Sequence, residues 1–185
     1  MGTDRHRVFF ALWPDDGVRD RIEAVSQVWR TASRCRWILP AKLHLTLAFL
    51  ADVGAEGLPR LEAVGSSQRL QAPLELCLDQ LELWRQPQVL CLTGMAPEPL
   101  RELVAELNRC LAAARFAVER RPFRCHLTLA RDARRLPEDR AFEPIRWRTA
   151  RLHLVESLPD LTGAPYRRLQ SWDLLGPAAS VGECG

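Results

Sequence analysis

The sequence predicts a domain of mixed helices and strands, made of two copies of one strand–helix–strand unit arranged around a pseudo-two-fold axis. Three observations support this. The tetrapeptide HLTL occurs at 44–47 and again at 126–129, 82 positions apart. An apolar run and a helical pattern precede both copies at matching distances, and a proline stands four residues before each motif histidine. The length of 185 residues fits about one domain, 1–185.

The first half is expected over roughly 7–50. The apolar run "VFFALW" (8–13) predicts a strand that ends at a proline. Two aspartates then offer a helix cap, and apolar residues at helical spacing predict an amphipathic helix over 16–32. The strand that carries the first HLTL closes the unit.

The second half, roughly 88–131, has the same order. "QVLCLTG" (88–94) predicts a strand, and 97–114 predicts a helix with Pro and Glu at its start. Val8 lies 36 residues before His44, and Val89 lies 37 residues before His126. Other predicted segments are strands at 73–79, within 145–157 and at 166–174, a short helix after about residue 54, a loop at 159–165 and a frayed tail at roughly 176–185.

Composition excludes some function classes. No apolar run approaches 18 residues and no signal peptide is visible, so we expect a cytoplasmic protein without a membrane span. Close-spaced Cys or His ligands are absent, so we expect no metal. The net charge of +3 permits a nucleic-acid partner without requiring one. Seven arginines crowd 115–135 around the second HLTL, where a solvated face and an RNA-binding face are both open interpretations.

Strand alternation gives HLTL two roles. Residues two apart point to the same face, so His44 and Thr46 project together, as do His126 and Thr128, while the leucines face a core. Two imidazoles can divide acid and base roles near neutral pH, and hydroxyls with an arginine can hold phosphoryl oxygens. This set predicts phosphodiester cleavage without metal or cofactor.

Other candidates have weaker support. His153 lies in the similar HLVE but lacks the threonine, so we expect a structural or surface role, and we expect His6 to be exposed before the first strand. Trp37 and Phe49 flank the first motif and suit either base stacking or core packing. Arg124 is a candidate RNA contact. Five tryptophans are expected in the core: Trp13, Trp29, Trp84, Trp147 and Trp172.

The paired motifs, in "PAKLHLTLAFL" and "RPFRCHLTLAR", resemble the 2H phosphoesterase superfamily, and most closely its RNA 2′,3′-cyclic phosphodiesterase branch, also called 2′-5′ RNA ligase. The opening "RVFFALWPDDGVRDRI" and the later "LHLVES" fit as well. The resemblance implies a two-lobed α+β fold, with antiparallel sheets around a central cleft and the motifs on facing strands. Two positions depart from the family, because Cys125 replaces a frequent proline and Ala51 a frequent glycine.

By this resemblance His44 would donate a proton to the leaving 3′ oxygen and His126 would activate water. Thr46, Thr128 and Arg131 would bind the phosphate. The substrate would be RNA or an oligonucleotide with a 2′,3′-cyclic phosphate end, the product a 2′-phosphomonoester, and the protein a monomer. By microscopic reversibility, the same site could join a 2′,3′-cyclic phosphate end to a 5′-hydroxyl through a 2′-5′ linkage. The alternatives are a phosphodiesterase for ADP-ribose cyclic phosphate or 2′-5′ oligonucleotides, and a non-catalytic RNA-binding module.

Overall fold

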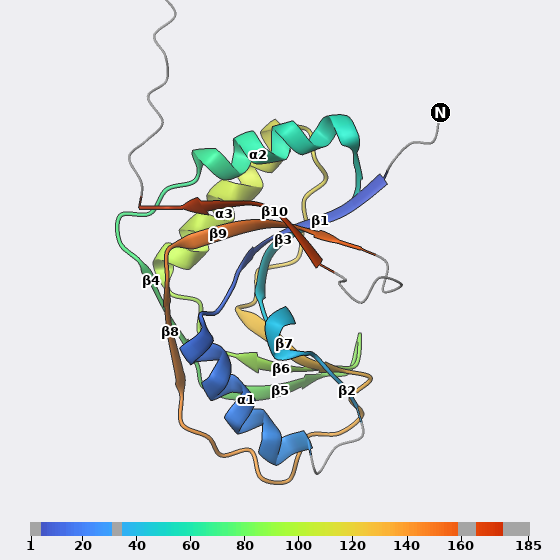
Figure 1. Ribbon diagram of the computed structural model, residues 1–185, viewed down its shortest axis with the longest axis vertical. Coiled ribbons are helices and arrows are strands. Elements are labelled where there is room, and N and C mark those ends of the chain that lie inside the picture. The colour runs from blue at the N-terminus through green and yellow to red at the C-terminus, as the bar shows by residue number, and fades with distance from the viewer. Residues whose placement is uncertain (1–4, 31–34, 159–165, 176–185) are drawn as a thin grey trace, which may run out of the picture.

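The structure is a computed structural model that describes residues 5–30, 35–158 and 166–175. Its described part has two lobes, each centred on a four-stranded antiparallel sheet (Figure 1). In spatial order the strands of the first sheet are β10 (Tyr166–Asp173), β9 (Arg151–Ser157), β1 (Arg5–Leu12) and β3 (Leu45–Gly54). Those of the second sheet are β2 (Arg36–Trp37), β7 (His126–Arg131), β6 (Val89–Thr93) and β5 (Gln80–Trp84). The expected two-lobed α+β fold is therefore confirmed.

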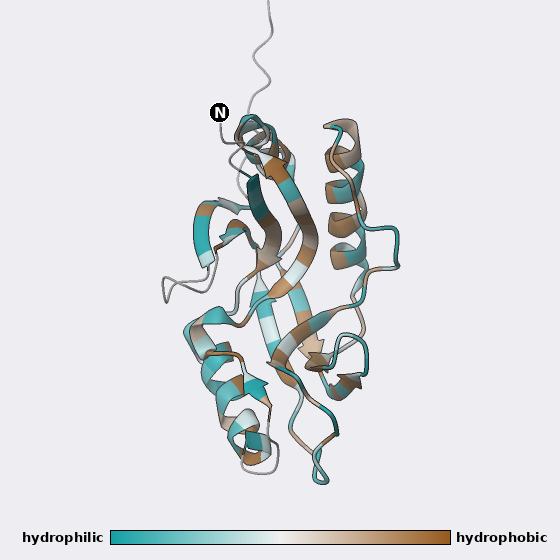
Figure 2. Cartoon of the chain, turned by 90° about the vertical axis from the view of Figure 1, so that its right-hand side faces the viewer, coloured by the Kyte–Doolittle hydropathy of each residue, from teal (hydrophilic) through white to brown (hydrophobic). Residues whose placement is uncertain are grey.

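Helices and a further strand pair complete the architecture. The pair consists of β4 (Leu74–Leu78) and β8 (Ile145–Thr149). The α-helices are α1 (Asp16–Arg30), α2 (Leu58–Ser67) and α3 (Glu98–Ala113), and the short 3-10 helices are η1 (Pro40–Lys42) and η2 (Ala55–Gly57). Figure 2 shows apolar and polar residues alternating along the helices, as amphipathic packing requires.

The duplication is visible in the topology. β1, α1 and β3 form the first unit, β6, α3 and β7 the second, and in each unit the HLTL strand pairs antiparallel with the unit's first strand. The two units are interlocked, because α3 contacts β3 of the other unit. Strand β2, which precedes the first motif, pairs with β7 of the second, with Trp37 opposite Ala130. This pairing joins the two motifs across the lobes.

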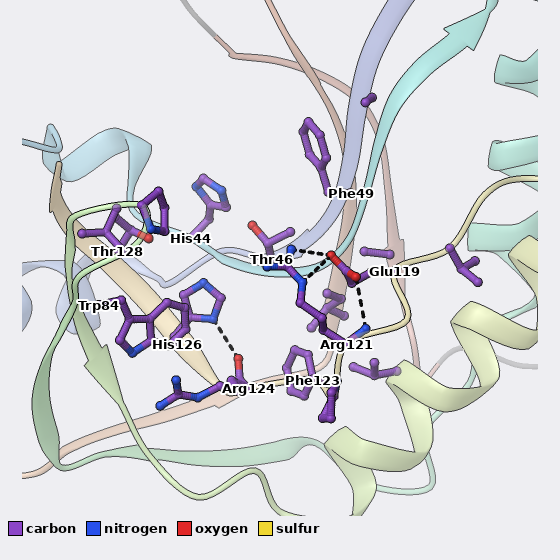
Figure 3. Close-up of a pocket in the computed structure, with 18 of the residues that line it drawn as sticks. His44, Thr46, Phe49, Trp84, Glu119, Arg121, Phe123, Arg124, His126 and Thr128 are labelled. Carbon is purple, nitrogen blue, oxygen red and sulfur yellow. Dashed lines mark hydrogen bonds and ion pairs between the residues drawn. The ribbon is translucent and has the colours of Figure 1, made fainter. Parts of the chain in front are cut away.

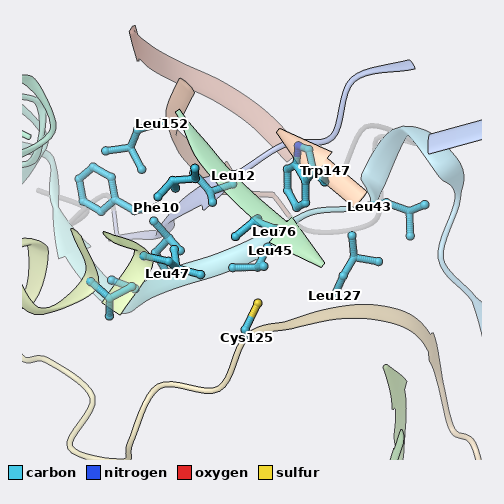
Figure 4. Packing of buried hydrophobic residues seen from close by; sticks show 14 of the residues in the cluster. Phe10, Leu12, Leu43, Leu45, Leu47, Leu76, Cys125, Leu127, Trp147 and Leu152 are labelled. Atoms are coloured by element: carbon cyan, nitrogen blue, oxygen red, sulfur yellow. The ribbon is translucent and has the colours of Figure 1, made fainter. Parts of the chain in front are cut away.

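The motif leucines lie in the core. Leu45 and Leu127 are fully buried, and Leu47 and Leu129 are nearly so. Figure 4 shows Leu45, Leu47 and Leu127 among the other apolar side chains of the core. Burying a leucine side chain contributes about 1.5–3 kcal/mol, so each motif is anchored to the fold by its apolar pair. Cys125 is also buried in this core, because its side chain points to the opposite side from that of its neighbour His126.

Some expectations need correction. His6 is not exposed: it is buried within β1, which begins at Arg5, and its Nδ1 lies 2.5 Å from Oε1 of Glu156. Strand β5 is an element that the sequence analysis did not predict, and a single residue separates it from β4. The end of the helix expected at 16–32, the loop at 159–165 and the tail at 176–185 fall partly or wholly outside the described residues.

Candidate active site

A cleft of about 1280 Å³ lies between the two motifs and is lined by residues of both halves. His44 and Thr46 line it from the first half, and His126 and Thr128 from the second (Figure 3). His44 immediately precedes β3, and His126 is the first residue of β7. The structure thus brings together the two His–Thr pairs that alternation placed on one face of each strand.

The two imidazoles are held in the same way. Nδ1 of His44 donates to the carbonyl oxygen of Lys42 at 2.7 Å, and Nδ1 of His126 donates to the carbonyl oxygen of Arg124 at 2.8 Å. A carbonyl can only accept, so each hydrogen bond places the proton on Nδ1 of the neutral ring. Nε2 of each ring is then available to a ligand in the cleft.

Aromatic side chains enclose His44. Its ring stacks on Phe9 at 4.8 Å and on Trp13 at 4.9 Å between centroids, and Tyr166 meets it edge-on at 5.3 Å. Burial lowers the pKa of His44 from 6.5 to about 4, against the effect of its hydrogen bond to Lys42. The charges of His126 and Arg131 contribute smaller parts of this lowering. His44 is therefore neutral at pH 7 in the free protein.

The surroundings of His126 are more polar. Its ring lies 4.5 Å from the ring of Trp84, and the guanidinium of Arg124 covers Trp84 at 4.3 Å. Burial lowers the pKa of His126, and its hydrogen bond to the Arg124 carbonyl opposes this. The Arg124 charge lowers the same pKa, while the carboxylate of Glu82 raises it. The pseudo-symmetric motifs therefore carry histidines in two different environments.

A bulge follows the threonine in both motif strands. In the β1–β3 ladder Thr46 and Ala48 have successive partners and Leu47 has none, and in the β6–β7 ladder Leu129 is skipped in the same way. An extra residue shifts the alternation by one, which explains the paired burial of Leu129 and Ala130. Residues five after each histidine return to the cleft: Phe49 in the first half and Arg131 in the second.

The remaining predicted residues have mixed outcomes. Arg124 lines the cleft, whereas Trp37 packs against the core. His153 is buried on β9, with Nδ1 2.7 Å from Oγ of Ser171, as a structural role requires.

Trp29 and Trp147 are core residues as predicted, and Trp172 packs against the core. Trp13 packs against a second, smaller core cluster and also stacks on His44. The core assignment is wrong for Trp84, which is half-buried beside His126. Sequence reasoning also missed Phe9, Tyr166 and Glu82 as neighbours of the site. The one available signal was alternation in the first strand, which places Phe9, Ala11 and Trp13 on a common face.

Within the described ranges, no three His, Cys, Asp or Glu side chains gather as a metal site. No helix of that same part of the chain is long and apolar enough to cross a membrane. A reaction without metal stays a prediction.

Comparison with known sequences identifies relatives. The model of the 2′-5′ RNA ligase superfamily matches residues 14–160. The Escherichia coli protein named RNA 2′,3′-cyclic phosphodiesterase is 32% identical over 133 residues, which cover 71% of this chain and 74% of the relative. An Archaeoglobus fulgidus protein of the same name is 28% identical over 134 residues, covering 71% of this chain and 76% of the relative.

Solved structures show the same likeness. A crystal structure described as a phosphoesterase superposes with a TM-score of 0.81 at 28% identity, covering 94% of this chain and all of the other. The crystal structure of Escherichia coli LigT in complex with 3′-AMP gives a TM-score of 0.80 at 26% identity, with the same coverage. Since the family model covers more than half of the sequence and the fold agrees, the chain belongs to the 2′-5′ RNA ligase superfamily of 2H phosphoesterases.

Proposed function

We propose that this chain is a metal-independent RNA 2′,3′-cyclic phosphodiesterase that opens the cyclic ester to a 2′-phosphomonoester. The names of the Escherichia coli and Archaeoglobus fulgidus relatives support phosphodiesterase activity. The observation that carries the finer assignment is the matched pair of imidazoles. His44 and His126 line one cleft, and each has Nδ1 fixed by a backbone carbonyl and Nε2 left for the substrate.

Thr46, Thr128 and Arg131 are the proposed phosphate ligands. The threonines follow the histidines on the same strand face, and hydroxyls can donate to non-bridging oxygens. Arg131 reaches the cleft through the bulge in β7 and brings a permanent positive charge. Lys42, Arg121 and Arg124 also line the cleft, which gives it a net positive lining suited to an anionic RNA end.

Proton transfer follows from these positions. Nε2 of His126 takes a proton from a water molecule, whose oxygen forms a bond to phosphorus. The bond from phosphorus to the 3′ oxygen breaks, and Nε2 of His44 donates a proton to that oxygen. The 2′ ester bond remains, so the product is a 2′-phosphate. Solvent exchange afterwards returns His126 to the neutral form, and His44, which is neutral in the free protein, takes up its next proton when a new substrate binds.

The low pKa of His44 is compatible with a proton donor. Burial and nearby positive charge disfavour the imidazolium in the free protein. A bound phosphodiester brings a negative charge into the same half-buried cleft, and an opposite charge within a few ångströms favours the charged imidazole. Substrate binding would thus raise the pKa of His44 and load it with the proton that it later donates.

The same site could also join two RNA ends, with a different nucleophile. A 5′-hydroxyl in place of water would attack the cyclic phosphate, and loss of its proton to His126 with protonation of the 3′ oxygen by His44 would give a 2′-5′ linkage. This ligation needs no further group, because the same bonds form and break. We infer that hydrolysis prevails in dilute solution, where water greatly exceeds any 5′-hydroxyl.

The test is the end group formed from an RNA that carries a 2′,3′-cyclic phosphate, incubated with the protein in excess EDTA. The proposal predicts turnover to a 2′-phosphate. A 3′-phosphate product would contradict the role of His44, and dependence on added metal would contradict the metal-free step. Turnover confined to ADP-ribose cyclic phosphate or to 2′-5′ oligonucleotides would show that the enzyme acts on that substrate instead of the cyclic phosphate RNA. RNA binding without turnover of any of these compounds would show that the chain is a non-catalytic RNA-binding module.

A further inference from the structure

Glu82 on β5 is the centre of a polar cluster behind the second motif. Its Oε2 accepts hydrogen bonds from Nε1 of Trp84 at 2.7 Å and from Nη2 of Arg124 at 2.6 Å. Its Oε1 accepts from Oγ1 of Thr93 at 2.9 Å. One carboxylate therefore connects three elements: β5, β6 and the segment that leads into β7.

Each of the three donors lies next to His126. Thr93 is the residue opposite His126 in the β6–β7 ladder. The Trp84 ring lies 4.5 Å from the imidazole, with the Arg124 guanidinium 4.3 Å from the centre of the same indole. The carbonyl of Arg124 accepts the Nδ1 proton of His126. Figure 3 shows Trp84, His126 and Arg124 together on one wall of the cleft.

We propose that Glu82 is a positioning residue for His126: by fixing Trp84 and Arg124 it sets the orientation in which the imidazole is presented to the substrate. The inference rests on the proposed function for the role of His126, and it adds a residue outside the HLTL motifs. Glu82 does not line the cleft, so it acts through its neighbours and has no contact with the substrate.

The geometry explains why a carboxylate suits this position. Trp84 and Arg124 present donors that converge on one oxygen, and an acceptor with several lone pairs can satisfy both. The side chain of Glu82 is 31% exposed, so its ion pair with Arg124 is partly shielded from water. Without it, the indole N–H would lose its partner and the Arg124 side chain would be free to leave the face of Trp84.

Charge gives a readout that a purely structural role would not move. Glu82 raises the pKa of His126, while Arg124, on the segment before β7, lowers it. His44 is the other titratable group that interacts with His126, and Glu82 is absent from the groups that act on His44. Removal of the carboxylate should therefore lower the pKa of His126 and leave that of His44 in place.

The experiment uses Glu82→Ala and Glu82→Gln, with Glu75→Gln on the exposed edge of β4 as a matched control. The histidine ring signals of the full chain are titrated by NMR, and kcat and KM are measured on the cyclic phosphate RNA. In both Glu82 variants the His126 titration should move to lower pH while that of His44 stays. In Glu82→Ala we expect kcat to fall roughly 10-fold or more, with KM changed less than about 3-fold. Glu82→Gln, which keeps an acceptor oxygen, should retain more of kcat.

Other outcomes separate this inference from the proposed function. A folded Glu82→Ala protein with an unchanged His126 titration and unchanged kcat would overturn it. If Glu82→Ala lowers the melting temperature but does not move the His126 titration, Glu82 has a structural role only. This result would also overturn the positioning inference. If the wild type does not hydrolyse the cyclic phosphate but its His126 titration responds to Glu82, the proposed function fails while the positioning relationship stands.

Discussion

Phe49 and Arg131 occupy equivalent positions in the two halves, each five residues after its motif histidine and each lining the cleft. The bulges at Leu47 and Leu129 bring both side chains to the face of the His–Thr pairs. One half thus offers an apolar ring and the other a positive charge. The duplication builds a pair of equivalent histidines, and these two residues make the cleft asymmetric, which would suit the base on one side and the phosphate on the other of the proposed RNA substrate.

Arg131 should matter for phosphate binding. A hydrogen bond to a charged group is worth about 1.5–3 kcal/mol, so Arg131→Ala should lower kcat/KM on the cyclic phosphate roughly 10-fold to 100-fold. Arg134→Ala is the matched control, because Arg134 is exposed nearby and does not line the cleft. Equal kinetics of the two variants would remove Arg131 from the site.

Phe49 should contribute to binding of the nucleotide. It is 43% exposed despite its apolar ring, with the guanidinium of Arg7 5.5 Å from its centre. Base stacking on an aromatic ring is worth about 1–3 kcal/mol, so Phe49→Ala should raise KM while leaving kcat in place. Met95→Ala, at an 83% exposed position outside the cleft lining, should behave as wild type. An unchanged KM in Phe49→Ala would exclude stacking there.

Trp13 should control the protonation of His44. Burial is the largest cause of the low pKa of His44, and Trp13 stacks on its ring. Trp13→Ala should therefore raise the pKa of His44 from about 4 toward 6.5, as measured by NMR titration. His126 provides the internal reference, because its ring packs on Trp84 instead. A His44 titration that does not move would show that burial by Trp13 is not the cause.

The buried histidines should make stability depend on pH. Burial lowers the pKa of His153 to about 4, so as the pH falls below 6.5 the unfolded chain binds a proton that the folded chain does not. Stability should therefore fall between pH 6.5 and pH 4, by on the order of 1 kcal/mol per pH unit for this residue. Urea unfolding at pH 7 and pH 5 measures it. His153→Gln should reduce the pH dependence, and an identical slope would contradict the assignment.

Most of the fold could be predicted from the sequence, because each element of the repeat occurs twice at matching spacing. Two apolar strands, two amphipathic helices and two HLTL strands at matching spacing predicted the units, and alternation within HLTL separated the leucines from the His–Thr pairs. The pairing of β2 with β7 was not accessible, because two residues are too few for a pattern.

The surroundings of the site were harder to predict. Strict alternation places Arg131 on the face opposite to His126, and only the bulge returns it to the cleft. Trp84 was expected in the core because aromatic composition alone cannot separate a core from an enclosed site, and for the same reason the stacking of Trp13 on His44 was not predicted. His6 was misassigned because a partner 150 residues away, Glu156, makes its burial possible. Such contacts depend on tertiary structure and leave no local signal.

The decisive measurement is turnover of an RNA 2′,3′-cyclic phosphate end in excess EDTA by the wild type and by His44→Ala and His126→Ala, each shown to be folded by circular dichroism. Loss of an acid or a base should reduce kcat about 10²-fold to 10⁴-fold in either variant, because in the proposed mechanism the two histidines, which line one cleft, serve one reaction. Wild-type turnover by either folded variant would contradict the shared site.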